Sequence, residues 1–335
     1  SYTAQQIADY AANSGTDQYP DTDWVDRVFS EDGVQQYHRI GLNGGSERVK
    51  VAASIAYTDQ DGNVKGYNFK RYNGRFNTDI KLNDKFNINF DLNFRRSERQ
   101  NPSQGLNSIT RDAYRIPPLY SAVNSDGTWG PGWNGFNPVA FVSEDAGFDN
   151  NQFNYFRGLV KLNYEPVQDL ILSLSYAPQH NGSNRKRFVG QYDFISYADG
   201  SSGTTPGQNS LLQSYSKSHQ DNFNFLINYS KEFIGEHKLS GLLGYENLKN
   251  TSSNFQASRR NFVLEEFPEL SNGDQDTQEN LGVSTLNGLE SVFGRVNYTY
   301  KDRYLVEANL RRDASSRFAK GYRADWFPSF SVGWN

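Results

Sequence analysis

The chain of 335 residues carries 34 basic and 38 acidic side chains, for a formal net charge of -4, and contains no cysteine. Only 36% of its residues are hydrophobic, yet 15% are aromatic. This composition excludes a disulfide framework and a thiolate metal site, and the lack of a long basic run argues against nucleic acid as a partner. Sparse, large and evenly spread apolar side chains indicate a wall rather than a globular core.

Alternation of apolar and polar residues predicts about eleven β-strands. It is clearest at 85–96, where Phe86, Ile88 and Phe90 alternate with polar residues. The predicted strands, in chain order, cover residues 36–43, 49–57, 71–82, 85–96, 155–164, 169–176, 222–230, 238–245, 292–300, 303–311 and 327–334. Most are eight to twelve residues long, which is close to the ~9–11 residues of a transmembrane strand.

The connections between these strands alternate strictly between short and long. The short ones are 44–48, 83–84, 165–168, 232–237 and 301–302, and the long ones are 58–70, 96–154, 177–221, 246–291 and 312–326. In an up-and-down meander, every second connection lies at the same end, so this sorting is typical of an outer-membrane barrel. We therefore predict an all-β fold, an antiparallel up-and-down transmembrane β-barrel, with a soluble β-sandwich as the alternative.

In such a barrel the apolar residues of 85–96 face lipid and the polar ones face the lumen. The same register predicts charged side chains that point into the lumen, namely Asp91, Arg95, Arg157, Lys161, Arg295, Glu307 and Arg311. Structural pairing with a plug inside the barrel is their expected role, with contact to the aqueous path as the alternative.

No catalytic constellation is recognisable. The four histidines have no HExxH spacing, and we expect His180 and His219 to be solvated residues in or beside a long loop. Glu265 and Glu266 form an acidic pair in a loop without a visible partner. The segment DQDGNVKG at 59–66 lacks the terminal carboxylates of a calcium loop. We therefore expect no enzyme activity, no catalytic residue, no metal site and no cofactor.

The long connection at 96–154 is the best candidate for contact with a ligand. It carries Tyr120, Trp129, Trp133 and Phe136 among glycines and asparagines. Aromatic rings stack on sugar or peptide faces at little entropic cost. We hypothesise that these four residues bind substrate and that Trp129 and Trp133 line an extracellular cavity. Packing of the loop over the barrel mouth or against a partner is an equal alternative.

Several ordered motifs carry a family resemblance. They are TDWVDRVF at 22–29, LNGGSERVKVAASIAYTDQDGNVKGYNFKRYNGRFN at 42–77, AYRIPPLYSAVNSDGTW followed by NPVA within 113–141, and SVFGRVNYTYKDRYLVEANLRRDASSRFAKGYRADWFPSFSVGW at 291–334. Together they resemble the barrel of SusC/RagA-type TonB-dependent outer-membrane transporters of the Bacteroidetes. That family's barrel has roughly 22 strands around a plugged lumen. The chain is thus expected to form about half of a barrel wall, without the plug and without the TonB-contacting segment.

The resemblance implies a function and a set of partners. It implies import of a glycan or peptide through the outer membrane, driven by TonB, with a SusD-like surface lipoprotein as partner and outer-membrane lipid around the barrel. Residues 1–35 are expected to form an extracellular loop region, and residues 36–335 a partial barrel domain. The alternatives are a non-transport surface module, such as an adhesin or carbohydrate-binding domain, and a barrel enzyme or passive porin. A surface module predicts that Phe86, Ile88 and Phe90 lie in a protein core.

Overall fold

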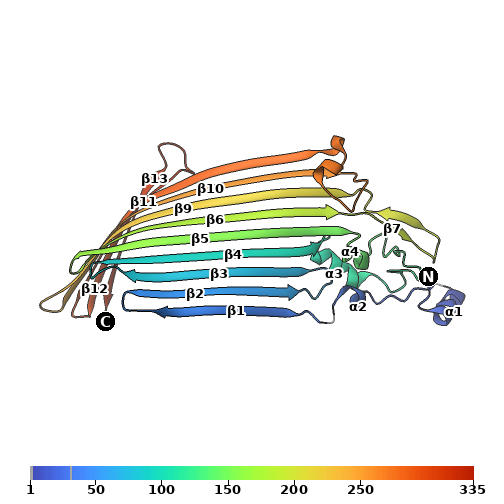
Figure 1. The fold of residues 1–335 in the computed structure, drawn as a ribbon, viewed down its shortest axis with the longest axis horizontal. Coiled ribbons are helices and arrows are strands. Elements are labelled where there is room, and N and C mark those ends of the chain that lie inside the picture. The colour runs from blue at the N-terminus through green and yellow to red at the C-terminus, as the bar shows by residue number, and fades with distance from the viewer. Residues whose placement is uncertain (1–2, 31) are drawn as a thin grey trace.

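The computed structural model describes residues 3–30 and 32–335, in which one antiparallel sheet of eleven strands dominates (Figure 1). Its strands, in spatial order, are β1 (Gln35–Gly45), β2 (Val49–Asp61), β3 (Asn68–Lys81), β4 (Phe86–Pro102), β5 (Gly147–Val167), β6 (Leu170–Val189), β9 (Ser210–Phe233), β10 (His237–Arg260), β11 (Glu279–Tyr300), β12 (Tyr304–Ser315) and β13 (Ala324–Trp334). Each strand pairs with the next one along the chain, except that β7 (Tyr192–Ile195) and β8 (Ser202–Thr205) form a separate hairpin. The predicted number and order of strands are confirmed.

The helices lie at one end of the sheet, in the segment before β1 and on the long connections (Figure 1). They are α1 (Ala4–Asn13), α2 (Trp24–Val28), α3 (Leu106–Arg115), α4 (Pro138–Phe141) and the single 3-10 turns η1 (Leu270–Asn272) and η2 (Gln275–Thr277). A reciprocal capping box starts α1, because the Thr3 side chain accepts from the Gln6 amide while the Gln6 side chain accepts from the Thr3 amide.

None of the helices in the described part of the chain is long and apolar enough to cross a membrane.

The strands are longer than predicted. β9 and β10 each have 24 residues, and much of the expected loop 177–221 is strand. The expectation of eight to twelve residues is wrong because it followed the alternation of apolar side chains. In segments such as SYSKSHQDN at 214–222 that alternation stops, while backbone pairing continues along polar residues.

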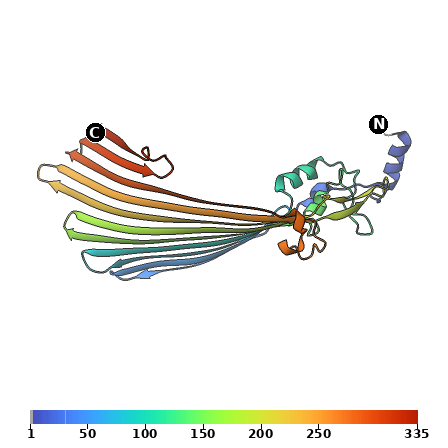
Figure 2. The same ribbon diagram turned by 90° about the horizontal axis from the view of Figure 1, so that it is seen from above.

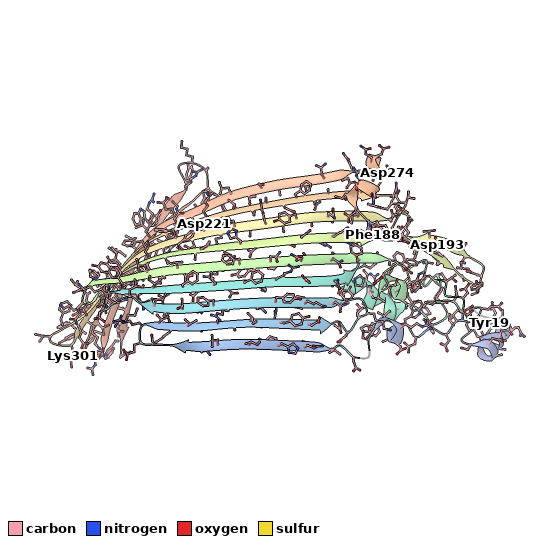
Figure 3. The ribbon with its side chains drawn as sticks, in the orientation of Figure 1. Tyr19, Phe188, Asp193, Asp221, Asp274 and Lys301 are labelled. Atoms are coloured by element: carbon pink, nitrogen blue, oxygen red, sulfur yellow. The ribbon has the colours of Figure 1, made fainter. Side chains whose placement is uncertain are left out.

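Short and long connections are sorted to opposite ends of the sheet. The short turns are 46–48, 82–85, 168–169, 234–236 and 301–303, and the long connections are 62–67, 103–146, 190–209, 261–278 and 316–323. Figure 3 shows Lys301, in a short turn, at one end, and Tyr19 and Asp193 at the other. Seen from above, the strands overlap in projection towards the long connections and spread apart towards the short turns (Figure 2), whereas Figure 1 shows them separated at the long-connection end. The predicted sorting is confirmed.

The register divides the sheet into an apolar face and a polar face. One row of cross-strand partners on the apolar face runs through Val49, Ile80, Ile88, Leu162, Leu174, Phe225, Tyr245 and Val292. The neighbouring row on the polar face runs through Lys50, Asp79, Asn89, Lys161, Ser175, Asn224, Glu246, Ser291 and Asp313. A shift of one residue would exchange the two sets, so the side-chain pattern fixes this register.

The side chains of the apolar face are largely uncovered. Ile40 is 72% exposed, Ile55 is 63% exposed and Phe330 is 69% exposed. A soluble sheet buries such a face, whereas a membrane barrel turns it to lipid. The seven charged residues predicted to face the lumen all lie on the polar face, as their register shows.

Candidate functional site

The connection between β4 and β5 is organised by one fully buried side chain. Asn137 is 0% exposed, and its amide nitrogen donates to the carbonyl oxygens of Ala122 at 2.7 Å and Gly130 at 3.0 Å. Its side-chain oxygen accepts from the backbone amides of Val139 at 3.0 Å and Ala140 at 3.2 Å, which caps α4. One residue thus satisfies four backbone groups and fixes the course of the whole connection.

Two of the predicted site residues form a tight turn on this connection. The backbone amides of Trp133 and Phe136 each donate to the other residue's carbonyl, at 3.1 and 3.0 Å. Between them Asn134 and Gly135 adopt left-handed conformations, with φ of 54° and 81°. Trp133 is 40% exposed, with the Arg115 guanidinium 5.6 Å from its ring, and Phe136 is 56% exposed. The turn therefore presents two apolar rings to solvent.

The other two predicted residues are held differently. Tyr120 is partly exposed, at 36%. The indole nitrogen of Trp129 donates to the Asp145 carboxylate at 2.9 Å, and its ring meets Tyr192 edge to face at 6.1 Å. The Tyr192 hydroxyl donates to the carbonyl of Gly135 at 3.0 Å, and burial raises the pKa of this hydroxyl. Trp129 is therefore part of the packing that supports the turn.

Trp129 also lines a cavity of about 830 Å3 where the strands meet the long connections. The acidic side chains around this cavity are Glu144, Asp145, Asp193, Glu265 and Glu266. The expectation that Glu265 lacks a partner is wrong, because its carboxylate accepts from the backbone amide of Gln191 at 2.9 Å and from the Asn209 side chain. Contacts between residues so distant in the chain leave no pattern in the sequence.

The polar face has the features of a surface in contact with water or polar groups. Six buried side-chain atoms have no hydrogen-bond partner within the described chain, and all belong to residues on this face: Thr58, Arg71, Asn87, Arg95, Asn181 and Ser291. Buried polar groups are normally paired with protein or water. The face is therefore suited to a hydrated lumen or to polar groups that pack against it.

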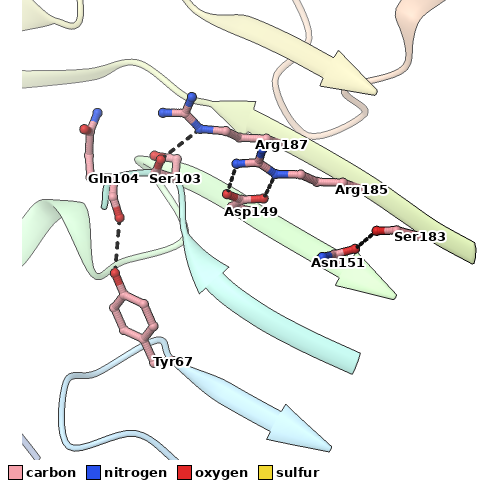
Figure 4. Close-up of polar contacts among 8 residues, drawn as sticks. All are labelled: Tyr67, Ser103, Gln104, Asp149, Asn151, Ser183, Arg185 and Arg187. Carbon is pink, nitrogen blue, oxygen red and sulfur yellow. Dashed lines mark hydrogen bonds and ion pairs between the residues drawn. The ribbon is translucent and has the colours of Figure 1, made fainter. Parts of the chain in front are cut away.

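At the long-connection end, the polar face carries a cluster of charged residues, three arginines and one aspartate, that we call the mouth cluster: Arg99, Asp149, Arg185 and Arg187. Arg185 forms a bidentate pair with Asp149, at 2.7 and 2.5 Å (Figure 4). Arg187 donates from Nε to the carbonyl of Ser103 at 3.0 Å. These residues line a cavity of about 430 Å3, so one carboxylate and three guanidinium groups border the same cavity.

The mouth cluster also perturbs a neighbouring tyrosine. The Tyr67 hydroxyl donates to the carbonyl of Gln104 at 3.2 Å (Figure 4). Burial, together with the negative charge of Asp149, raises the pKa of Tyr67 to about 12. Sequence reasoning missed this cluster, because Arg99, Arg185 and Arg187 fall in segments predicted to be long loops. Extending the period-two register past the last apolar residue of each strand would have placed them on the polar face.

The expected positions of two histidines are wrong. His180 and His219 lie within β6 and β9, where they are cross-strand partners with stacked rings and Nδ1 atoms 3.1 Å apart. In residues 3–30 and 32–335, no group of three or more side chains is arranged to hold a metal ion.

Comparison with known proteins shows which proteins the chain resembles. No family model matches the chain. The TonB-dependent receptor P26 of Formosa agariphila is 28% identical over 330 residues, which cover 94% of this chain and 31% of that receptor. The TonB-dependent receptor SusC of Bacteroides thetaiotaomicron is 26% identical over 342 residues, covering 93% of this chain and 32% of SusC. The chain is related to the SusC/RagA-type TonB-dependent receptors.

Solved structures support an outer-membrane barrel fold for this chain. The RagAB peptide importer in its open-open state superposes with a TM-score of 0.78 at 19% identity, covering 99% of this chain and 39% of that one. The outer membrane transporter YddB from Escherichia coli gives a TM-score of 0.58 at 9% identity, covering 91% and 36%. The eleven-stranded sheet is outer-membrane barrel wall, and the chain spans about a third of the length of the curated relatives it matches.

Proposed function

We propose that this chain forms part of the wall and mouth of a receptor that imports a nutrient, such as a glycan or peptide, across the outer membrane. The observation that carries the proposal is the division of one sheet into a continuous apolar face and a polar face, with all long connections at one end. This arrangement supports a lipid-embedded wall with an extracellular mouth above it. The uncovered apolar face argues against a soluble adhesin or carbohydrate-binding domain.

We infer the same division of the chain as the sequence indicates. Residues 1–35 belong to the extracellular loop region, and residues 36–335 to the barrel domain. TonB would supply the energy through a part of the receptor outside this chain, and a SusD-like lipoprotein would cover the mouth. The chemistry is binding and release, with no bond made or broken. The names of the related SusC and RagAB proteins support this inference.

Within the mouth, Trp133 and Phe136 are proposed to contact the substrate, with Tyr120 beside them on the same connection. Their exposure supports direct contact, since an exposed ring loses little packing when a ligand covers it. Trp129 is proposed to line the neighbouring acidic cavity, where its hydrogen bond to Asp145 fixes its orientation. The mouth cluster on the polar face would meet anionic groups of the substrate as they enter the lumen.

The test is nutrient uptake by cells that carry the whole receptor as their sole copy. We expect the double substitution Trp133→Ala and Phe136→Ala to lower substrate affinity about tenfold or more, as loss of two aromatic anchors does at other binding sites. Phe267→Ala is a matched control, because Phe267 is 64% exposed on a different long connection. Unchanged uptake by the double variant, with normal surface expression, would remove these residues from the site. Uptake that persists without TonB would refute the transport mechanism itself.

A further inference from the structure

Two adjoining hollows interrupt the lipid-facing side of the wall. The first, which we call the apolar hollow, has a volume of about 400 Å3 and crosses β1 to β5. It forms where Ala53 and Gly74 leave a gap among larger side chains such as Ile55, Phe76 and Leu92. Four steps between strands of about 4.8 Å make it roughly 19 Å wide.

The second hollow, the polar groove, has a volume of about 820 Å3 and shares Phe94 and Phe156 with the apolar hollow. Its lining includes side chains that donate or accept hydrogen bonds, among them Asn154, His180, Asn184, Lys217, Thr251 and Ser253. The two hollows therefore form one continuous depression that changes from apolar to polar at two phenylalanines.

The order of the two hollows matches the depth of a membrane. Phe94 is the last apolar residue of the alternating run in β4, and Arg96 follows it on the same face. The polar groove lies beyond Phe94, on the side of the long connections, which is the extracellular side of such barrels. The apolar hollow thus lies at the depth of acyl chains and the polar groove at the depth of outer-leaflet head groups.

The polar groove also offers an uncompensated positive charge. Lys217 is exposed and makes no hydrogen bond or ion pair within the described residues, 3–30 and 32–335. The nearest carboxylate on the same strand, Asp221, is already engaged, since its oxygens lie 2.8 Å from His219 Nε2 and 2.5 Å from the Tyr176 hydroxyl. An ammonium beside hydroxyl and amide groups suits a phosphorylated sugar.

We propose that this depression binds one outer-leaflet glycolipid, with an acyl chain in the apolar hollow and a phosphorylated sugar head group in the polar groove. The site is distinct from the mouth, because it lies on the opposite face of the sheet. A neighbouring protein is a poorer occupant, since half of the depression lies among acyl chains, where a protein would have to displace lipid.

The proposal is tested by native mass spectrometry of the whole receptor in phosphatidylethanolamine nanodiscs. The nanodiscs contain a minor fraction of a multiply acylated, bisphosphorylated diglucosamine lipid as probe. Gly74→Leu fills the apolar hollow, because a Cβ there meets only the Phe94 Cβ, at 3.9 Å. Gly241→Leu is its control: Gly241 faces lipid on β10 outside both hollows, and a Cβ there has a single neighbour at 4.0 Å. Lys217→Ala is paired with Lys70→Ala, a lysine on the same face outside the groove.

We expect Gly74→Leu to reduce retention of the probe about tenfold and Gly241→Leu to leave it unchanged. Lys217→Ala should weaken retention of the bisphosphorylated probe, but not of its dephosphorylated form, and Lys70→Ala should affect neither. Equal retention by all variants would overturn the proposal. So would equal loss with Gly241→Leu, which would indicate ordinary lipid contact, or a co-purifying protein at the site. Heat-dependent mobility of the barrel on gels identifies any variant that has not folded, and Ala53→Leu then replaces Gly74→Leu.

Discussion

A charge placed at the centre of the apolar face gives the most direct test of how the sheet is oriented. Eight steps separate Phe86 from Phe94, so the apolar run of β4 extends about 26 Å along the strand. At a tilt of ~45° this is roughly 19 Å along the membrane normal, with Phe90 about 9 Å from either limit. At this depth, Phe90→Arg should lower the free energy of unfolding by ~2–4 kcal/mol.

The assay is denaturant unfolding of the whole receptor in lipid vesicles, followed by tryptophan fluorescence. Asn77→Arg is the matched control. Asn77 is the register partner of Asp91, one step from the pair Thr78 and Phe90, so it lies at the same depth on the polar face. Its new guanidinium would face the Asp91 carboxylate and water. The substitution also removes the exposed hydrogen bond that Arg75 Nε donates to the Asn77 side chain at 3.2 Å, so the variant should unfold within about 1 kcal/mol of the wild type. Equal destabilisation by both substitutions would refute the assignment of the two faces.

Three further predictions concern the long connections. Asn137→Ala leaves the Gly130 carbonyl without its donor, removes one of the two donors to the Ala122 carbonyl and uncaps α4, so we expect a local loss of about 2–3 kcal/mol, seen as faster hydrogen exchange at the Val139 and Ala140 amides. Trp129→Phe removes the hydrogen bond to Asp145 and should cost about 1 kcal/mol, read out as faster proteolysis of 103–146, while Trp133→Phe should not change the cleavage rate. The Thr128 and Tyr197 groups that donate to Asp126 lower its pKa from 3.8 to about 2. Because the folded-state pKa is depressed, this contact stabilises the loop above pH 3.8 and is lost as the pH falls towards 2, so protection from an acid protease should decline across that window and Asp126→Asn should abolish the dependence.

Much of the sheet could be predicted from the sequence, because a period of two is visible wherever one face meets lipid. The alternation from Phe86 to Phe94 is an example, and it fixes both register and face. The same signal fails beyond the apolar band, where both faces meet polar surroundings and side chains such as Lys217 and Lys249 on the outer face are as polar as those inside. The ends of the strands therefore cannot be predicted from the sequence pattern in this region, although backbone pairing continues to Arg260.

The candidate site was predictable as a location but not as an arrangement. Exposed rings among glycines marked the connection that carries Trp133 and Phe136. Whether each ring is buried or exposed depends on Asn137 and on partners such as Tyr192, which is 55 residues from Asn137 in the chain. Such contacts join elements that local pattern does not connect.

The length of β9 and β10 has a mechanical consequence. From Tyr245, on the long row of the apolar face, to the end of β10 at Arg260, the strand continues for fifteen steps, or about 50 Å. With the tilt of such barrels this places the end of β10 roughly 35 Å beyond the level of Tyr245 in the apolar band. A hydrogen-bonded sheet is stiffer than single loops, so β9 and β10 form a rigid extension of the wall. The long connections that β9 and β10 carry are therefore held at a fixed distance from the apolar band.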